Sequence, residues 1–351
     1  MSKRIVICCD GTWNEPEQRD NCGPAATNVA KFASAVRSQD AAGTAQVVYY
    51  HKGVGTRGVL DRLTGGAFGT GLSENIEDCY LFLVNNYVPG DELYLVGFSR
   101  GAYSVRSLAG LIRNSGILRA QYLTRYAEAY KLYRYRSDQS RPSAEPAKAF
   151  RAAYAWPDAE LHFIGVWDTV GALGIPVTGL RRWKWNRKRY EFHDVMLSTR
   201  VRYAYQALAL DERRKAFEPT LWQKQADAPA TQVLAQAWFP GVHSDVGGGY
   251  GESGLSDCAL TWMCERAVRS GLAMDLSLIP SGEVTGPMHE SLNWFYRLIG
   301  AASRKWGASN PTGYELLHRT AIERAERDPH YGGDWVQCLS KTDRAGSEAA
   351  Q

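Results

Sequence analysis

A serine flanked by glycines, Gly97-Phe-Ser99-Arg-Gly101, follows a short apolar run and precedes a segment with helical periodicity. A serine on such a sharp turn exposes its hydroxyl, and small residues on either side let strand and helix approach closely. The start of a helix also offers amide groups and a positive dipole end to a developing oxyanion. The pattern therefore predicts that Ser99 is a nucleophile. The alternative is an ordinary tight turn of an α/β protein.

Two further residues have the types and positions that such a serine needs. A serine hydroxyl requires a base within hydrogen-bond reach, and the base requires an acid that orients it. In α/β-hydrolases the acid and then the histidine follow the serine, each at the carboxyl end of a strand. Asp168 follows the apolar run 161–167, and His243 lies in a glycine-rich loop just after the run 233–239. This order predicts Asp168 as the acid and His243 as the base.

The remaining histidines leave one competitor open. His289 also follows Asp168 and lies in a loop marked by glycine and proline, so it is an alternative base. Asp245 is a less suitable acid, because it comes two residues after His243. Polar or helical surroundings predict that the following histidines are surface residues: His193, His318 and His330.

The loop after the first apolar run, CDGTW at 9–13, also lies where a strand is expected to end. Backbone amides of Gly11 or Thr12 could complete an oxyanion hole with the amide of Arg100. Asp10 is then expected to brace the loop rather than to take part in chemistry. An ordinary Asp-Gly turn is the alternative.

The same strand ends allow a different chemistry. Asp10, Asp168, His243 and Asp245 could gather there as oxygen and nitrogen ligands of a metal ion. The second hypothesis is therefore a metal-dependent phosphoester hydrolase, whereas the serine mechanism needs no cofactor. A third hypothesis, a non-catalytic binding protein on a hydrolase fold, is disfavoured because no member of the predicted triad is missing.

The elements that must position these residues alternate between short apolar runs and helical periodicity, which predicts a mostly parallel sheet covered by helices. The expected strands are 4–9, 46–50, 93–98, 161–167 and 233–239. The expected helices are 28–38, 73–87, 101–116, 121–135, 195–208, 257–271 and 311–327. Residues 1–339 are expected to form one domain with lid-like insertions near 120–157 and 175–195, and the small, polar tail 340–351 is expected to be disordered.

The composition is that of a globular protein, with 351 residues of which 44% are hydrophobic and 22% are charged. A net charge of +4 is too weak to indicate nucleic-acid binding. Seven cysteines without a Cys-x-x-Cys pair argue against a disulfide framework or structural zinc. No apolar stretch reaches the roughly 18 residues that would span a bilayer, and the first apolar run is too short for a signal peptide. The expected location is the cytoplasm of the producing cell.

One segment suggests how a substrate could be selected. Residues 180–194 (LRRWKWNRKRYEFHD) interleave basic and aromatic side chains, and we expect Arg181, Arg182, Trp183 and Trp185 to bind substrate. Such a mixture suits an anionic headgroup or transient contact with a membrane surface. It would equally suit single-stranded nucleic acid, which we consider the less favoured partner. A solvated loop above buried aromatic rings is the alternative.

Five ordered motifs together resemble one family: CDGTWN (9–14), VGFSRGAYSVRSLAGLI (96–112), GVWDTVGALG (165–174), ALALDERRKAFEPTLW (207–222) and WFPGVHSDVGGGY (238–250). The chain resembles an α/β-hydrolase family that includes type VI secretion phospholipase effectors. The resemblance implies an α/β-hydrolase fold, a triad of Ser99, Asp168 and His243, and cleavage of lipid or phospholipid acyl esters. It also implies possible export by type VI secretion, with an immunity or secretion protein as partner.

Overall fold

The central feature of the computed structural model is a parallel β-sheet. The structure describes residues 2–11, 14–53, 67–135, 141–157, 159–170, 195–292, 294–304, 306 and 314–332. Within these ranges seven strands form the sheet, and each neighbouring pair is parallel. In spatial order the strands are β4 (Gln46–His51), β1 (Arg4–Cys9), β5 (Glu92–Phe98), β6 (Leu161–Trp167), β8 (Val201–Ala209), β10 (Val233–Phe239) and β11 (Glu315–Leu317). The predicted α/β fold is therefore confirmed.

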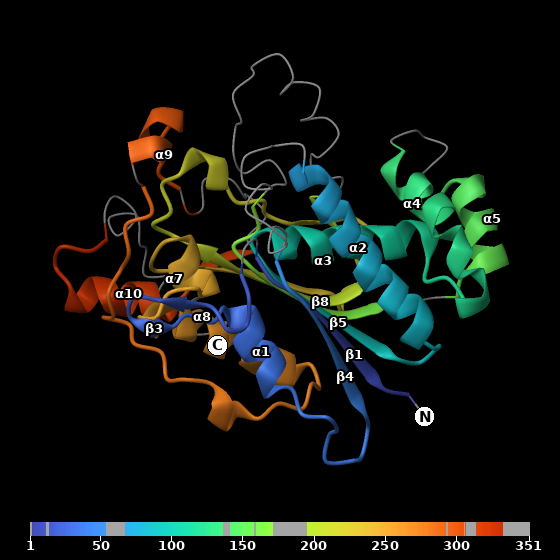
Figure 1. The fold of residues 1–351 in the computed structure, drawn as a ribbon, viewed down its shortest axis with the longest axis horizontal. Helices are drawn as coiled ribbons and strands as arrows, with labels where there is room; N and C mark the ends of the chain where they lie inside the picture. The colour runs from blue at the N-terminus through green and yellow to red at the C-terminus, as the bar shows by residue number, and fades with distance from the viewer. Residues whose placement is uncertain are drawn as a thin grey trace.

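Helices cover both faces of this sheet (Figure 1). The α-helices are α1 (Asn28–Ala35), α2 (Ala67–Asn86), α3 (Arg100–Ser115), α4 (Tyr126–Arg134), α5 (Glu145–Tyr154), α7 (His243–Gly247), α8 (Gly254–Arg269), α9 (Trp294–Ile299) and α10 (Arg319–Arg327). Short 3₁₀ helices are η2 (Ala120–Arg125), η4 (Lys215–Phe217) and η5 (Leu276–Leu278). Two small sheets pair β2 (Arg19–Asp20) with β3 (Gly23–Pro24), and β7 (Met196–Leu197) with β9 (Gln223–Lys224).

Alternation of side chains along the strands divides the core into two layers. Ile5 and Ile7 of β1 pack in one hydrophobic cluster with α2 and α3, whereas Val6 and Cys8 pack in another with α1 and α8. Successive side chains of a strand point to opposite faces, so a strand buried on both sides reads as a continuous apolar run. This is why RIVICC in β1 shows no polar position that would mark a solvent face.

The strand order changes direction beside β1. The chain passes from β1 to β4 on one side, and then returns to place β5 on the other side. In open α/β sheets, ligands bind outside the carboxyl ends of the strands at such a switch point. The residue that follows β5 is Ser99, so the predicted nucleophile lies at this position.

The predicted helix over 195–208 is wrong, because this stretch contains the central strand β8 between β6 and β10. Alanine, leucine and glutamine favour a helix locally, but here Ala204, Ala207 and Leu208 are fully buried in the sheet. Periodicity cannot separate a strand covered on both faces from a buried helix. The predicted helix 311–327 is likewise divided into the short strand β11 and helix α10.

The two predicted insertions are described to different extents. Within 120–157, helix α4 packs against α3, where the Ser115 hydroxyl donates to the carbonyl of Ala129 and Asn114 donates to the carbonyl of Leu132. These contacts are at the carboxyl end of α3, opposite to Ser99. Residues 175–194 of the second insertion and the tail 340–351 lie outside the described residues. No helix in the described part is both long and apolar enough to cross a membrane.

Candidate active site

Ser99 occupies a strained turn between β5 and α3. Its backbone has φ 56° and ψ −118°, and Ser99 and Asp168 are the two non-glycine residues with positive φ in the described part of the chain. Such conformations cost of order 1–3 kcal/mol each and concentrate at functional sites. A Cβ at Gly97 would lie 2.7 Å from the backbone of Gly101, and a Cβ at Gly101 would lie 2.1 Å from the carbonyl oxygen of Cys9. The glycines therefore permit the close approach of α3 to β5 and β1.

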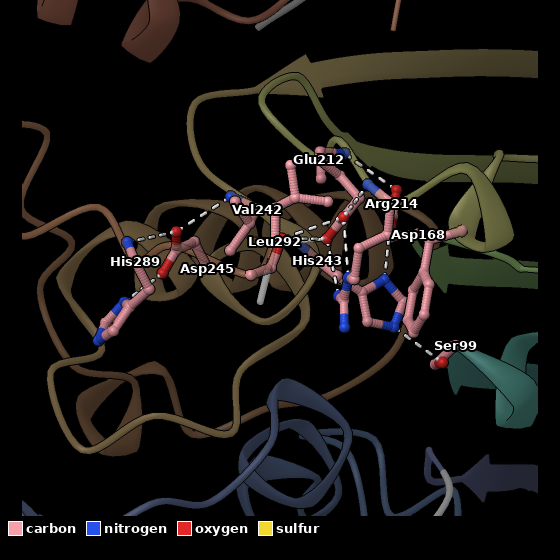
Figure 2. A network of polar contacts seen from close by, with 12 residues as sticks. Ser99, Asp168, Glu212, Arg214, Val242, His243, Asp245, His289 and Leu292 are labelled. Carbon is pink, nitrogen blue, oxygen red and sulfur yellow. Dashed lines mark hydrogen bonds and ion pairs between the residues drawn. The ribbon is translucent and has the colours of Figure 1, made fainter. Parts of the chain in front are cut away.

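Three side chains form a hydrogen-bonded series at this turn (Figure 2). The Oγ of Ser99 lies 2.8 Å from Nε2 of His243, and Nδ1 of His243 lies 2.5 Å from Oδ2 of Asp168. All three residues are buried. The sheet brings the first and last together, because Phe98 pairs with Trp167 and the next residue of each strand leaves the sheet beside the other.

His243 begins the short helix α7, just after β10. Its imidazole lies between two aromatic rings, with centroids 4.7 Å from Phe98 and 4.8 Å from Phe217. Burial lowers the pKa of His243, although the hydrogen bond and the charge of Asp168 oppose this shift. The imidazole is therefore neutral at pH 7, which is the state a general base requires.

Asp168 is an ionised carboxylate whose lone pairs are fully used. Its Oδ1 accepts from the amide of Ala209 at 3.0 Å and from Nη1 of Arg304 at 2.6 Å. Its Oδ2 accepts from Nη2 of Arg304 at 3.0 Å, besides the contact with His243. Burial alone would raise the pKa of Asp168, but the charge of Arg304 and the hydrogen bond to His243 together hold this pKa well below its usual range.

Arg304 is a site residue that sequence reasoning missed. It lies between α9 and β11, and its side chain is only 5% exposed. Besides Asp168, it donates to the carbonyl oxygens of Ala209 and Phe217. Arg304 lies outside the five motifs, so no local pattern could have marked it.

Glu212 and Arg214 form a second support that sequence reasoning missed. Oε2 of Glu212 accepts from the backbone amide of His243 at 3.2 Å and from Nη2 of Arg214 at 2.7 Å. Burial opposes the ionisation of Glu212, but Arg214 holds its pKa below the usual value. The hydroxyl of Ser291 also donates to Glu212. Both residues belong to the motif ALALDERRKAF, which was the available signal.

The predicted oxyanion loop is only partly described. Asp10 accepts from the hydroxyls of Thr27 and Tyr50, each at 2.6 Å, and thus braces the loop as expected. The amide of Gly11 donates to Oδ1 of Asp10 at 2.7 Å, so in this structure it already has an acceptor. Arg100 supplies the first amide of α3, directly after Ser99. Thr12 lies outside the described residues, and so do Arg181, Arg182, Trp183 and Trp185.

The four residues of the metal hypothesis do not converge on one point, although Asp168 and His243 contact each other. Asp10 and Asp168 are each held by hydrogen-bond donors, and Asp168 additionally contacts the cation of Arg304. Asp245 faces His289 instead of His243. Across the described ranges there is no group of three or more His, Cys, Asp or Glu side chains that could hold a metal ion.

His289 has a different environment from His243. Its Nδ1 lies 2.6 Å from Oδ1 of Asp245, its Nε2 lies 3.7 Å from Glu252, and its ring stacks on Tyr250. In Figure 2 this pair lies at the opposite end of the polar network from Ser99. The geometry therefore favours His243 over His289 as the base.

Of the three histidines expected at the surface, His330 is exposed and His193 lies outside the described residues. The expectation for His318 is wrong. Its ring stacks on Phe239 of β10 at 4.2 Å, and burial lowers its pKa to about 3. Packing of the α10 start against the sheet edge buries it.

A cavity of about 600 Å³ lies on the Asp168 side of the network. Its polar lining includes Glu212, Arg214 and Arg304, and its apolar lining includes Leu221 and Trp238. Ser99 does not line it. The reacting hydroxyl of a serine mechanism would therefore lie outside this cavity.

Comparison with known proteins supplies the family. The family described as T6SS, phospholipase effector Tle1-like, catalytic domain, matches residues 3–266. Because the match extends over most of the chain, the chain belongs to that family. The sequence resemblance noted above is thereby confirmed.

The individual proteins that the chain resembles are at most 29% identical to it. The uncharacterized protein YEL023C of Saccharomyces cerevisiae is 29% identical over 237 residues, which are 62% of this chain and 32% of the relative. An uncharacterized protein structure from Pseudomonas aeruginosa is 16% identical, with a TM-score of 0.44, and the match covers 80% of this chain and 49% of that one. The structure of the Tle1 effector bound to the VgrG spike from the type 6 secretion system is 20% identical, with a TM-score of 0.39, covering 71% and 51%. The chain thus spans about a third to a half of the length of these relatives.

Proposed function

We propose that this member of the Tle1-like phospholipase effector family is a serine hydrolase that cleaves acyl esters of lipids. The observation that carries the proposal is the pair of contacts from His243, at 2.8 Å to the Ser99 hydroxyl and at 2.5 Å to the Asp168 carboxylate. A nucleophile, its base and an orienting acid in this order are what acyl transfer through a covalent intermediate requires. The family supplies the lipid as substrate class.

In the proposed reaction, Oγ of Ser99 attacks the acyl carbonyl while Nε2 of His243 takes the hydroxyl proton. The tetrahedral intermediate then breaks its bond to the leaving alcohol, and His243 protonates that alcohol. A water molecule, deprotonated by His243, then attacks the acyl-enzyme. The second tetrahedral intermediate breaks its bond to Oγ of Ser99, His243 returns the proton to that oxygen, and the fatty acid is released. Asp168 fixes the imidazole tautomer and stabilises the imidazolium in both steps.

The oxyanion in this reaction needs hydrogen-bond donors that are already in place. The amide of Arg100 is the first donor in the proposal, because it begins helix α3 directly after the nucleophile. The loop 9–13 remains the proposed source of a second donor, since the end of β1 lies against Gly101. The Gly11 amide would have to leave Oδ1 of Asp10 to serve, which makes Thr12 the simpler proposal.

The decisive experiment compares two buried serines of the same turn and helix. We expect Ser99→Ala to abolish hydrolysis of p-nitrophenyl butyrate and of phosphatidylcholine vesicles, and to abolish labelling by a fluorophosphonate. Ser104 is the matched control, because it is also buried and its hydroxyl donates to the backbone carbonyl of Arg100 within its own helix. Ser104→Ala should keep both activity and labelling.

The rival metal mechanism makes the opposite prediction. Activity that survives Ser99→Ala and disappears with a chelator would contradict the serine mechanism and favour metal-dependent phosphoester hydrolysis. Hydrolysis of the butyrate ester without hydrolysis of the vesicles would keep the mechanism and remove the lipid from the proposal.

The family also extends the proposal to delivery. T6SS effectors pass through a secretion machine, and the Tle1 effector has been solved bound to a VgrG spike. For this chain we place type VI export, a spike protein and an immunity protein in the proposal. Co-purification with a spike protein encoded by the same organism would support it, and export that does not depend on the secretion machine would contradict it.

A further inference from the structure

Arg304 has a role that neither the family nor the serine motif assigns. We infer that Arg304 is a positioning residue, which holds Asp168 as a charged, oriented acceptor and thereby keeps His243 available as a base at lower pH. The inference rests on the proposed function, because it concerns the base of that same reaction. Arg304 also lies beyond residues 3–266, the part of the chain that the family matches.

The geometry of Arg304 is that of a fixed clamp. Nη1 lies 2.6 Å from Oδ1 of Asp168 and Nη2 lies 3.0 Å from Oδ2, so the two groups meet side by side. Each nitrogen also donates to a main-chain carbonyl, that of Ala209 or that of Phe217. A planar guanidinium held at four acceptors cannot rotate freely, so it fixes the plane of the carboxylate as well.

The buried carboxylate of Asp168 needs a neighbouring cation to remain ionised. The side chain of Asp168 is fully buried, and a buried carboxylate without a partner takes up a proton. A neutral Asp168 would neither select the reactive tautomer of His243 nor stabilise the imidazolium. Asp168 also sits at φ 39°, a backbone conformation that persists only where surrounding contacts hold the residue in place.

Other charged groups near the pair have partners of their own. Glu212 and Arg214, which follow β8, form an ion pair at 2.7 Å. Asp10, which follows β1, is held by Thr27 and Tyr50, and Asp245 of α7 is paired with His289. Arg100 of α3 is half-buried, and desolvation lowers its pKa to about 10, so it remains a cation. Within the described part of the chain, Arg304 is the cation in direct contact with Asp168.

Loss of Arg304 should change the pH dependence of activity in one direction only. Without Arg304, the negative charge of Asp168 is uncompensated, so it favours the protonated form of His243. Asp168 itself also becomes easier to protonate, because burial raises the pKa of an unpaired carboxylate. Both effects let the pair take up a proton at higher pH. Loss of Arg304 should therefore move the acid limb of kcat/KM to higher pH.

The test is the pH profile of kcat/KM on a soluble ester for a set of variants. Arg304→Met removes the charge and should raise the apparent pKa of the acid limb by about one unit, as expected for loss of an opposite charge at this distance. Arg304→Lys keeps the charge without the two-point hold, so kcat should fall about tenfold while the limb stays in place. Arg304→Gln can still donate to Asp168 without a charge and should move the limb as Arg304→Met does.

Arg324 offers a matched control for structural loss. It is a buried arginine whose guanidinium donates to the carbonyls of Val284 and Gly286. Arg324→Met should lower the melting temperature and leave the acid limb where it is. If Arg304→Met does not fold, Arg304→Gln provides the neutral variant.

An acid limb that stays in place in a folded Arg304→Met or Arg304→Gln variant overturns the inference. Ser99→Ala separates this result from failure of the proposed function. If Ser99→Ala is inactive and the limb does not move, only the role of Arg304 is lost. If Ser99→Ala retains activity, the serine mechanism is lost as well.

Discussion

The protein contains two histidine–aspartate pairs that look alike at first sight. In each pair Nδ1 of the histidine contacts a nearly inaccessible carboxylate, at 2.5 Å between His243 and Asp168 and at 2.6 Å between His289 and Asp245. Figure 2 shows both pairs in one polar network. They differ in what lies beyond the shared hydrogen bond.

The two pairs differ in the group that faces Nε2 of the histidine and in the charge beside the aspartate. Nε2 of His243 faces the Ser99 hydroxyl, whereas Nε2 of His289 faces the carboxylate of Glu252 at 3.7 Å. Arg304 helps to lower the pKa of Asp168, whereas burial raises the pKa of Asp245 despite the hydrogen bonds it accepts. A histidine–aspartate contact is therefore not in itself a sign of catalysis. The group that faces the second ring nitrogen and the charge behind the acid distinguish the two pairs.

The histidines should give the largest contrast. We expect His243→Gln to lower kcat by about 10⁴-fold or more, because in the proposed mechanism the serine loses its base. His289→Gln should change kcat by less than about threefold, since its ring contacts no member of the Ser99 series. Steady-state hydrolysis of a short-chain ester measures both. Similar losses in the two variants would mean that the pairs are not functionally distinct.

The aspartates should give the next largest contrast. Asp168→Asn presents an amide to His243 and to Arg304 in place of a charged acceptor, so we expect kcat to fall by about 10³- to 10⁴-fold. Asp245→Asn should leave kcat nearly unchanged and cost about 1 kcal/mol of unfolding free energy, because Asp245 accepts from the amides of Val242 and His289. Kinetics and urea unfolding of both variants separate these effects.

The pH dependence sharpens the contrast further. Because the pKa of His243 is lowered from its usual 6.5, the acid limb of kcat/KM should have an apparent pKa below 6.5, with activity lost as pH falls through that value. His289→Gln should leave this limb in place. If the acid limb of the native protein has an apparent pKa above 6.5, or if it moves in His289→Gln, then His243 is not the group that titrates as the base.

The smallest contrast concerns the backbone. Ser99 has a positive φ, so Ser99→Gly should be more stable than Ser99→Ala by about 1 kcal/mol. Asp245 lies within helix α7, so the order should reverse, with Asp245→Gly less stable than Asp245→Ala by about 0.5–1 kcal/mol. Glycine and alanine both lack the polar group of the native side chain, so each comparison measures the backbone effect alone. Unfolding free energies from urea titration test the sign.

The sequence was sufficient for the features that depend on local pattern. Short apolar runs identified β1, β5, β6 and β10, because strands covered on both faces carry no polar interruption. The glycines around Ser99 and the aspartate at the end of β6 placed two members of the hydrogen-bonded series. Parallel pairing of Phe98 with Trp167 then brings Ser99 and Asp168 together, because each is the next residue after its strand.

What the sequence could not provide depends on packing between distant segments. β8 resembled a helix because its alanines suit both structures, and only its neighbours β6 and β10 decide between them. His318 looked polar and exposed, but Phe239 covers its ring. Arg304 has no motif, and its role depends on a carboxylate 136 residues earlier in the chain.

These long separations have a consequence for synthesis. The hydrogen bond between the Ser99 hydroxyl and Nε2 of His243 joins residues 144 positions apart, and the guanidinium that contacts Asp168 is supplied only when residue 304 has been added. At about 5–20 residues per second, the interval between translation of Ser99 and translation of Arg304 is roughly 10 to 40 seconds. During that interval Asp168 lacks the guanidinium that contacts its carboxylate in the folded protein, so the complete series of contacts at Ser99 can form only after residue 304 has been added.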